Sequence, residues 1–491
     1  MSEKMLFPWI SLGITILAVT TIWTWRQSSA EKARRGATIG LLATFLTMLA
    51  TGLEAFRGHG NPLAEPLPVG EGVFSADPLN GLLLPLYSGL TLGMIVLAPR
   101  RKVTPRWLSG LLILAVMTLT TYAANNLAVF ALAWTATLIP FLKRHFFSQT
   151  EEHALPPASR IILTVSAILL VCGTILLIML SAGPTLLERL SLSQPRIVQS
   201  GESLLAYAAF TTLLLAIILR KGLFPAHSWV APSFENGPLI PLTLLFNGHL
   251  GAFALARLVL PLLPGISNTA LPLVGDLGLL TAGLAAVLAI SERSPRRLLA
   301  LLSISQSSFI VTGLESSNQD AVAGALVHWQ VVVVATSVLT AVYAGIEARL
   351  GTPLEGRSLL GLARSAPRLA VFFAIAGLAL VGLPLTLGFV AEDLLLHGTL
   401  ETHPQLGFIL PVVTALNAFH IIRLFATIFL GRPSNSAPTI PDALPRERWV
   451  LTAAIVLLIL GGLFPALLVR LPVDAAEHIL KTVLSSATLS H

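Results

Sequence analysis

The sequence predicts an all-α polytopic membrane protein with about 14 transmembrane helices. Of its 491 residues, 54% are hydrophobic and 11% are charged, and the mean hydropathy is +0.81. A soluble domain carries about 25% charged residues, so this chain has too few for a surface that faces water. Apolar runs of about 20 residues, the length that crosses a bilayer, recur along the whole chain.

Fourteen such runs are bounded by charged residues or by Pro and Gly. They lie near residues 6–25, 36–56, 78–98, 105–123, 126–142, 159–181, 203–227, 239–263, 271–290, 297–315, 321–346, 369–391, 405–430 and 449–470. The first run is too long for the core of a signal peptide, so we expect a retained anchor. Asn125 and Asn126 separate the fourth run from the short fifth, although one helix is the alternative. The tail over 473–491 has helical spacing and is either an interfacial helix or a frayed end.

The Lys and Arg residues alternate with these spans. The loops after the odd-numbered spans, with their edges, hold 21 of the 31 basic residues, the opposite side with both termini holds 6, and 4 lie within spans. Because cytoplasmic loops are enriched in Lys and Arg, we expect a multi-pass protein of the cell inner (plasma) membrane with both termini on the non-cytoplasmic side. The net charge of +7 therefore reports topology and does not indicate nucleic-acid binding.

Ionisable side chains inside the spans are the candidates for function, because each costs several kcal/mol unless it faces a protein interior or a hydrated cavity. They are Arg220, Lys221, His227, His249, Arg257, His328, Glu392, Asp393, His420 and Arg423, with Asn247, Ser305, Gln306 and Gln330 as polar company.

Lys221 is the sharpest candidate. Gly222 and Pro225 follow it and loosen the helix, which frees backbone carbonyls for water and side chains. A lysine at such a break can exchange protons. The alternative is that Arg220 and Lys221 mark a helix end and extend to the interface.

Glu392 is the second, because it follows a run that Pro384 and Gly388 interrupt. Two broken segments in spans 7 and 12 predict inverted repeats. The repeats would be spans 4–8 (105–263) and spans 9–13 (271–430), preceded by spans 1–3 (1–104) and followed by span 14 with the tail (449–491). The alternative for Glu392 and Asp393 is an ordinary acidic pair at a helix end.

Two of the histidines allow two interpretations. His249 and His328 are either proton relays or hydrogen-bonded core residues. His420 and Arg423 lie one turn apart and share a helix face, whereas Arg257 is expected to be structural. The single cysteine, Cys172, allows neither a disulfide nor a thiolate metal site, and no nucleotide or haem motif is present. We expect no cofactor, no metal and no active site of the chain's own.

Three stretches carry a resemblance to a known family. "KGLFPAHSWVAPSFENGP" (221–238) resembles the broken seventh helix of the antiporter-like proton-translocating subunits of respiratory complex I, Mrp-type Na+/H+ antiporters, membrane hydrogenases and Dab-type inorganic carbon pumps. "SPRRLLALLSISQSSFIV" (294–311) resembles the family's tenth helix, and "GLPLTLGFVAED" (382–393) resembles the twelfth. The positions that match the family's motifs around the first break are Lys221, Pro225, His227, Trp229, Glu235 and Pro238. Glu392 falls at the key position of the second.

The chain departs from the family's pattern at two charged positions. Trp134 is followed by Thr135, where the family usually has the glutamate that pairs with the lysine of the seventh helix. Thr336 lies near an expected lysine of the eleventh helix. The missing charge beside Lys221 would have to come from Glu235, Glu54 or another subunit.

The resemblance implies a proton- or Na+-translocating subunit of a larger energy-coupled complex. The expected proton path is Lys221, His227, His249, His328 and Glu392, with Glu235, Asp393, His420 and Arg423 in support. With an uncharged residue, Thr135, after Trp134, the chain resembles most the membrane subunit of a Dab-type carbon pump. The partner of that subunit is a large soluble zinc protein that resembles a carbonic anhydrase. The alternatives are a divergent complex I or hydrogenase subunit, a cation antiporter subunit, and a scaffold whose channel is inactive.

Overall fold

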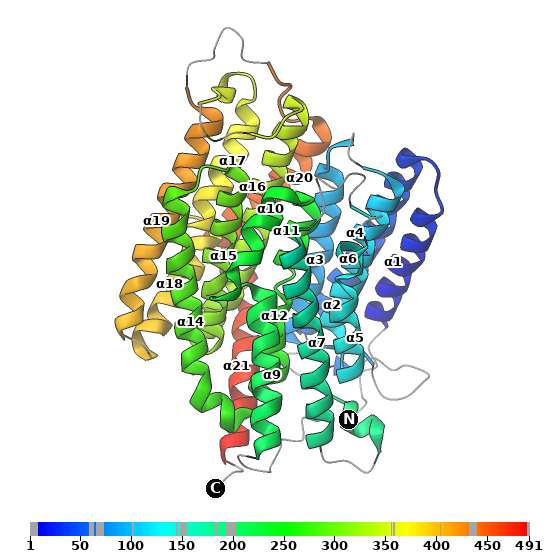
Figure 1. The fold of residues 1–491 in the computed structure, drawn as a ribbon, viewed down its shortest axis with the longest axis vertical. Coiled ribbons are helices and arrows are strands. Elements are labelled where there is room, and N and C mark those ends of the chain that lie inside the picture. The colour runs from blue at the N-terminus through cyan, green and yellow to red at the C-terminus, as the bar shows by residue number, and fades with distance from the viewer. Residues whose placement is uncertain are drawn as a thin grey trace.

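The structure is a computed structural model that describes residues 8–57, 63–64, 73–100, 103–143, 146–147, 155–181, 185–192, 203–354, 356, 359–402, 404–431 and 439–488. Its helices lie side by side along the long axis of the molecule (Figure 1). Two short strands, β1 (Leu63–Ala64) and β2 (Ser75–Ala76), pair antiparallel. The predicted all-α fold is confirmed.

The first half of the chain forms short and long helices, of which α3, α4, α5, α8 and α9 begin at polar caps. The Asn126 side chain accepts the backbone N–H of Ala128 at 2.9 Å, so α4 and α5 are separate helices. The elements are α1 (Trp9–Trp25), α2 (Ala30–Arg57), α3 (Pro78–Leu97), α4 (Pro105–Ala123), α5 (Leu127–Ala136), α6 (Ile139–Leu142), α7 (Pro157–Leu180), α8 (Leu186–Leu190), α9 (Leu204–Lys221), the 3-10 turn η3 (Ala226–Trp229) and α10 (Val230–Asn236).

The second half contains the longest helices. Its elements are α11 (Leu239–Asn247), α12 (Leu250–Ala254), the π turn η4 (Leu255–Val259), α13 (Leu260–Leu262), α14 (Pro264–Ser291), α15 (Pro295–Leu314), α16 (Gln319–Leu350), the 3-10 turn η5 (Leu362–Arg364), α17 (Pro367–Leu380), α18 (Leu387–Thr402), α19 (Pro404–Phe429), α20 (Pro445–Leu463) and α21 (Ala466–Thr488). Helices α15 and α16 lie at the centre, since nearly all their residues are buried.

These elements account for the fourteen predicted spans. Among the described residues, ten helical segments are long and apolar enough to cross a membrane, counting α11 to α13 as one. Three shorter apolar segments (α1, α5 with α6, and α17) and the pair α20–α21, which bends by 75°, supply the other four. The tail is helical to Thr488, and α21 packs against α16 and α3, so it is not frayed.

Both predicted helix breaks are present, and they are built by the same turn. Helix α9 ends at Gly222 with a φ of +72°, and the N–H of Leu223 bonds the carbonyl of Ile218 at 3.1 Å. Helix α17 is followed by Gly382 with a φ of +69°, and the N–H of Leu383 bonds the carbonyl of Leu378 at 3.0 Å. Glycine adopts this left-handed conformation without strain.

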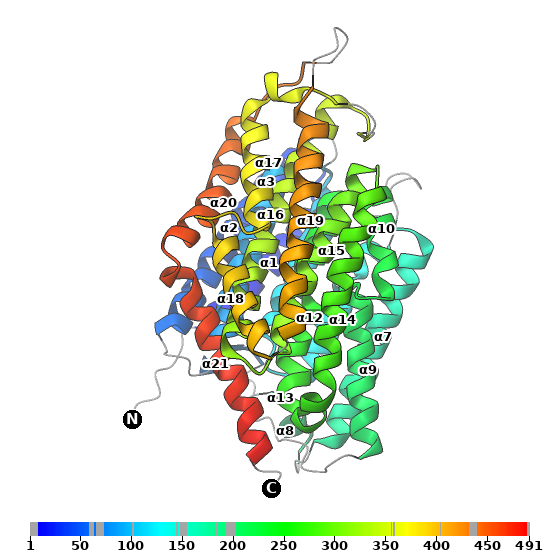
Figure 2. The same ribbon diagram turned by 90° about the vertical axis from the view of Figure 1, so that its left-hand side faces the viewer.

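The two broken helices run in opposite directions. The chain rises from α9 to α10 and descends from α17 to α18 (Figures 1 and 2). Pro225 lies in the first break, directly before η3, and Pro384 lies in the second. Gly388 is in the first turn of α18, where any side chain would collide with the carbonyl of Ala379. The opposite directions are what inverted repeats require, while the repeat boundaries stay a prediction.

Candidate functional site

The amino group of Lys221 is buried at the end of α9, and Lys221 is only 3% exposed. Its Nζ lies 2.9 Å from Nδ1 of His249 and 5.7 Å from the ring centre of Phe246. The left-handed turn at Gly222 stops the helix directly after the lysine. The side chain therefore enters the bundle at the break and reaches the eighth span.

His249 occupies a third break that the sequence reading did not identify. Its φ of +39° separates α11 from α12, and the hydroxyl of Tyr122 donates to the free carbonyl of Gly248. The second ring nitrogen of His249, Nε2, is buried and has no hydrogen-bond partner among the described residues. The His249 ring packs edge-on against Trp329, with ring centres 5.4 Å apart.

Thr336, where the resemblance implies a lysine, supports this third break. The side-chain amide of Asn247 donates to the hydroxyls of Thr336 and Ser337, both at 2.9 Å. It also contacts the carbonyl of Val333 at 3.2 Å. The hydroxyls of α16 therefore hold the end of α11 in place.

His328 stands next to Trp329 on α16 and continues the polar contacts into α15. Its Nε2 lies 3.0 Å from the backbone carbonyl of Gln306. Nδ1 of His328 and both side-chain amide atoms of Gln306 are buried without partners in the described part of the chain. Buried polar atoms are nearly always hydrogen-bonded to protein or to water, so this region favours bound water.

From α15 the polar contacts lead to Glu392. The side-chain amide of Asn417 on α19 donates to the Ser305 hydroxyl at 2.8 Å. One turn earlier on α19, the Thr414 hydroxyl donates to Oε1 of Glu392 at 3.3 Å. The Glu392 carboxylate lies against Gly382, where a methyl group would collide with it.

Together these side chains form a polar axis that joins the two broken helices, and we call it the buried polar axis, although Thr414 and Glu392 at its second end are only half-buried. We use this name for Lys221, His249, His328, Gln306, Ser305, Asn417, Thr414 and Glu392. Hydrogen bonds make four of its links, one of them to the backbone carbonyl of Gln306. Neighbouring residues on one helix or packed rings make the others. A row of protonatable groups and unpaired polar atoms can pass protons through bound water.

Several predicted residues lie off this axis. His227 is half-buried beyond the first break and stacks on Phe224 with ring centres 5.9 Å apart. Asp393 points away from the axis, is 54% exposed and contacts His397. Nε2 of His420 lies 2.7 Å from the carbonyl of Ala286.

Arg423 closes the end of a neighbouring helix. Its guanidinium donates to the last carbonyls of α14, those of Ala289 and Ile290, at 2.5 and 2.7 Å. Unpaired carbonyls at a helix C-terminus attract a cation. This contact indicates a structural role for Arg423.

Neither predicted glutamate supplies the charge beside Lys221. Glu235 pairs with Arg297 at 3.1 Å, and Glu54 accepts the indole N–H of Trp9 at 3.0 Å. The Thr135 hydroxyl bonds the carbonyl of Ala131 in its own helix. Lys221 thus has an imidazole, not a carboxylate, as its close partner.

Arg220 is a second buried cation beside Lys221. Its guanidinium donates to the Thr137 hydroxyl at 2.6 Å and lies 5.6 Å from the ring centre of Trp134. Nη1 of Arg220 and the indole N–H of Trp134 are buried without partners among the described residues. Arg220 thus contacts the fifth span on both sides, in sequence terms, of Thr135, the position at which the resemblance implies a glutamate.

An ion-pair cluster on the surface joins α10 to α15. Arg297 contacts Glu292 at 2.7 Å as well as Glu235. Burial alone would raise the pKa of Glu292, but the backbone N–H of Ser294 and the guanidinium of Arg297 donate to its carboxylate and hold the pKa below the usual value. Segment α10, which follows the first break, is therefore tied to the loop before α15.

The chain is similar to a known family of membrane proteins and to solved structures. A family model described as "NADH:quinone oxidoreductase/Mrp antiporter, TM" matches residues 124–417. The chain is 28% identical over 441 residues to NADH-quinone oxidoreductase subunit 13 of Thermus thermophilus, covering 88% of this chain and 92% of that protein.

Solved structures share the fold. A chain of respiratory complex I from Thermus thermophilus superimposes with a TM-score of 0.82 at 24% identity, covering 96% of this chain and 99% of that one. A chain of the Mrp complex from Dietzia sp. superimposes with a TM-score of 0.81 at 18% identity, covering 99% of this chain and 100% of that one.

Proposed function

Because the chain belongs to the NADH:quinone oxidoreductase/Mrp antiporter transmembrane family, we propose that it translocates protons, or Na+, as a subunit of a larger membrane complex. The observation that carries this proposal is the buried polar axis between two oppositely directed broken helices. The named relatives are subunits of multi-subunit membrane complexes, which supports the expectation of partner subunits.

In the proposed path, a proton moves between Lys221 and His249 along their 2.9 Å contact. His249 and His328 each have one free ring nitrogen among the described residues, so each ring can accept a proton on one side and release it on the other through water. The hydroxyl and amide groups of Ser305, Asn417 and Thr414 orient that water. Glu392 then holds the proton at the second break.

Proton flux into liposomes that contain the full-length protein tests this path. Lys221→Ala and Glu392→Gln are each expected to lower the flux at least tenfold, because each removes a group that carries the proton. Asp393→Asn is the matched control: it neutralises the neighbouring carboxylate, which lies off the axis, and should leave the flux unchanged. Unchanged flux in both axis variants would favour the scaffold reading.

For the complex itself, we propose the membrane subunit of a Dab-type inorganic carbon pump, located in the plasma membrane. The supporting observation is Thr135, together with the absence of a carboxylate partner for Lys221 among the described residues. Cation flow would then drive the conversion of CO2 to bicarbonate in a soluble zinc-containing partner. The competing assignment is a divergent complex I or hydrogenase subunit. The observation in its support is the 28% identity to the complex I-type subunit of Thermus thermophilus.

Purification of the tagged protein from its native membrane separates these assignments. A large soluble zinc protein in stoichiometric amount supports the carbon pump. Iron–sulfur subunits in its place contradict the carbon pump and support a redox complex. Further antiporter subunits alone would indicate a cation antiporter.

A further inference from the structure

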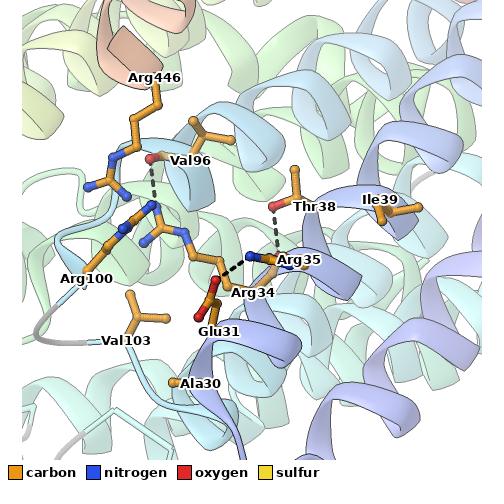
Figure 3. Close-up of a pocket in the computed structure, with 10 residues that line it drawn as sticks. All are labelled: Ala30, Glu31, Arg34, Arg35, Thr38, Ile39, Val96, Arg100, Val103 and Arg446. Atoms are coloured by element: carbon orange, nitrogen blue, oxygen red, sulfur yellow. Dashed lines mark hydrogen bonds and ion pairs between the residues drawn. The ribbon is translucent and has the colours of Figure 1, made fainter. Parts of the chain in front are cut away.

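An open cavity of about 580 Å³ lies between the start of α2, the end of α3 and the start of α20. Four arginines line it, with one glutamate: Arg34, Arg35, Arg100, Arg446 and Glu31. Figure 3 shows the guanidinium groups of Arg34, Arg100 and Arg446 gathered at one place. Positive charges held close together repel one another, so this arrangement of guanidinium groups favours an anion between the three arginines.

The carboxylates nearest to the cavity are already engaged. Glu31 pairs with Arg35 at 2.5 Å, and Glu447 pairs with Arg349 at 2.5 Å. Among the described residues neither carboxylate pairs directly with Arg34, Arg100 or Arg446. The negative charge of Glu447 still acts on Arg34 and Arg446 from a distance and offsets part of their repulsion.

Several arginine nitrogens in the cavity lack an acceptor. Nη2 of Arg34 donates to the carbonyls of Ile95 and Val96 at the end of α3, both at 2.8 Å. Nη1 of Arg34, and Nε and Nη1 of Arg446, are buried and have no hydrogen-bond partner in the described ranges. Guanidinium groups in such positions bind phosphate oxygens well, because their planar N–H groups match them.

A second groove, of about 500 Å³, continues from this cavity between α1 and α2. Its lining shares Arg35 and Ile39 with the first cavity and adds Val19, Trp23 and small residues such as Gly36. Ile39 and Val19 are 69% and 61% exposed. Helices α1 and α2 stand at the edge of the bundle (Figure 1). The groove can thus receive a hydrocarbon chain directly from the bilayer.

Tryptophans mark the membrane boundary at the same level. Trp23 and Trp25 at the end of α1 are 43% and 48% exposed, and Trp449 near the start of α20 is 79% exposed. Exposed tryptophans gather at the headgroup level of a bilayer. The arginine cavity therefore lies where phospholipid headgroups lie.

We propose that the cavity and the groove together bind one phospholipid with an anionic headgroup. The phosphate group contacts Arg34, Arg100 and Arg446, and an acyl chain lies in the groove between α1 and α2. The site rests on different residues from the polar axis and does not depend on ion translocation.

Native mass spectrometry of the full-length protein in detergent tests the site. Phosphatidylglycerol and phosphatidylcholine with identical acyl chains are titrated against the wild type and the double variant Arg100→Gln/Arg446→Gln. Arg34 is kept, because it also caps α3. The wild type is expected to prefer phosphatidylglycerol, and the double variant to bind it more weakly by about fivefold for each arginine removed.

Two controls separate the possible outcomes. Arg293→Gln removes an exposed arginine outside the cavity and should leave the lipid affinity unchanged. Val19→Trp fills the groove outside the arginine cavity and should weaken the binding of phosphatidylglycerol but not of inorganic phosphate. Melting curves without lipid check that every variant is folded.

Equal affinity for the two lipids, or an equal loss in Arg293→Gln, would overturn the proposal. It would also be overturned if inorganic phosphate bound with the same dependence on Arg100 and Arg446 while phosphatidylglycerol did not bind, because the site would then hold a free ion.

Discussion

Nζ of Lys221 and Nδ1 of His249 lie 2.9 Å apart, at two different helix breaks. Each group reaches the other because its own helix stops at that residue. The contact therefore depends on two left-handed turns, at Gly222 and at His249 itself. It is also the first link of the proposed path.

Replacement of the imidazole tests this link. His249→Asn is expected to fold normally, because Asn tolerates the left-handed conformation at this position, yet it cannot carry a proton. Proton flux in liposomes should fall at least tenfold. His397→Asn, which changes an exposed histidine off the axis, should have wild-type flux, and a similar fall in both variants would contradict the role of His249.

The link between α15 and α19 is tested by a double-mutant cycle. Asn417→Leu and Ser305→Ala each break the 2.8 Å bond between these side chains, so both should lower the flux. Because they remove the same bond, the double variant should lose less than the product of the two single effects. Fully multiplicative losses would show that the two groups act separately.

The partner of Arg220 has a measurable effect on stability. Thr137→Val removes the hydroxyl that accepts from the buried guanidinium and should destabilise the protein by about 1–3 kcal/mol. Thr135→Val removes a hydroxyl that bonds only its own helix and should cost less. Thermal unfolding in detergent measures both, and equal losses would argue against the importance of the Arg220 contact.

Substitutions at two left-handed glycines can distinguish the effect of backbone strain from the effect on the Glu392 side chain. Gly382→Ala and Gly351→Ala both place a side chain at a left-handed residue, with φ of +69° and +78°, and each should cost about 1–2 kcal/mol of stability. Only at Gly382 would the new methyl group meet the Glu392 carboxylate, whereas nothing lies within 4 Å at Gly351. The flux should fall in Gly382→Ala alone. Normal flux in that variant would show that the position of Glu392 is not critical.

The ion pairs that connect α10 to α15 should stabilise the protein less at low pH. The pKa of Glu292 is lower in the folded protein than its ordinary value, so its contribution is complete above the ordinary pKa and is lost as the pH falls through the lowered one. The effect is a fraction of a kcal/mol, because the pair is partly exposed. In Glu292→Gln this acid-dependent part of the melting temperature should disappear, while an unchanged pH profile would assign it to other groups.

The sequence allowed the two main breaks to be predicted, because Gly and Pro interrupt apolar runs beside Lys221 and Glu392. The break at His249 was missed: its signal is the pair Asn247–Gly248, which is typical of turns but stands inside a continuous apolar run. The sequence also did not predict which side chains from distant parts of the chain contact each other.

Asn417 and Thr414 lie one and two turns before His420 and continue the polar helix face of His420 and Arg423. This spacing was a usable signal, but the sequence does not show which partners the face meets. Glu235 was one of three possible sources of the charge beside Lys221, with Glu54 and another subunit. Only the fold shows that the turn after η3 carries Glu235 to Arg297.

The repeated turn at Gly222 and Gly382 has an electrical consequence. Each turn ends a helix, and a helix C-terminus carries a partial negative charge of about half an electron. At the first turn this charge lies at the residue that carries the basic side chain of Lys221, which can balance it when protonated. At the second it lies beside the carboxyl of Glu392, which cannot. Two turns of the same geometry thus face different neighbours, a basic group at one end of the axis and an acidic group at the other.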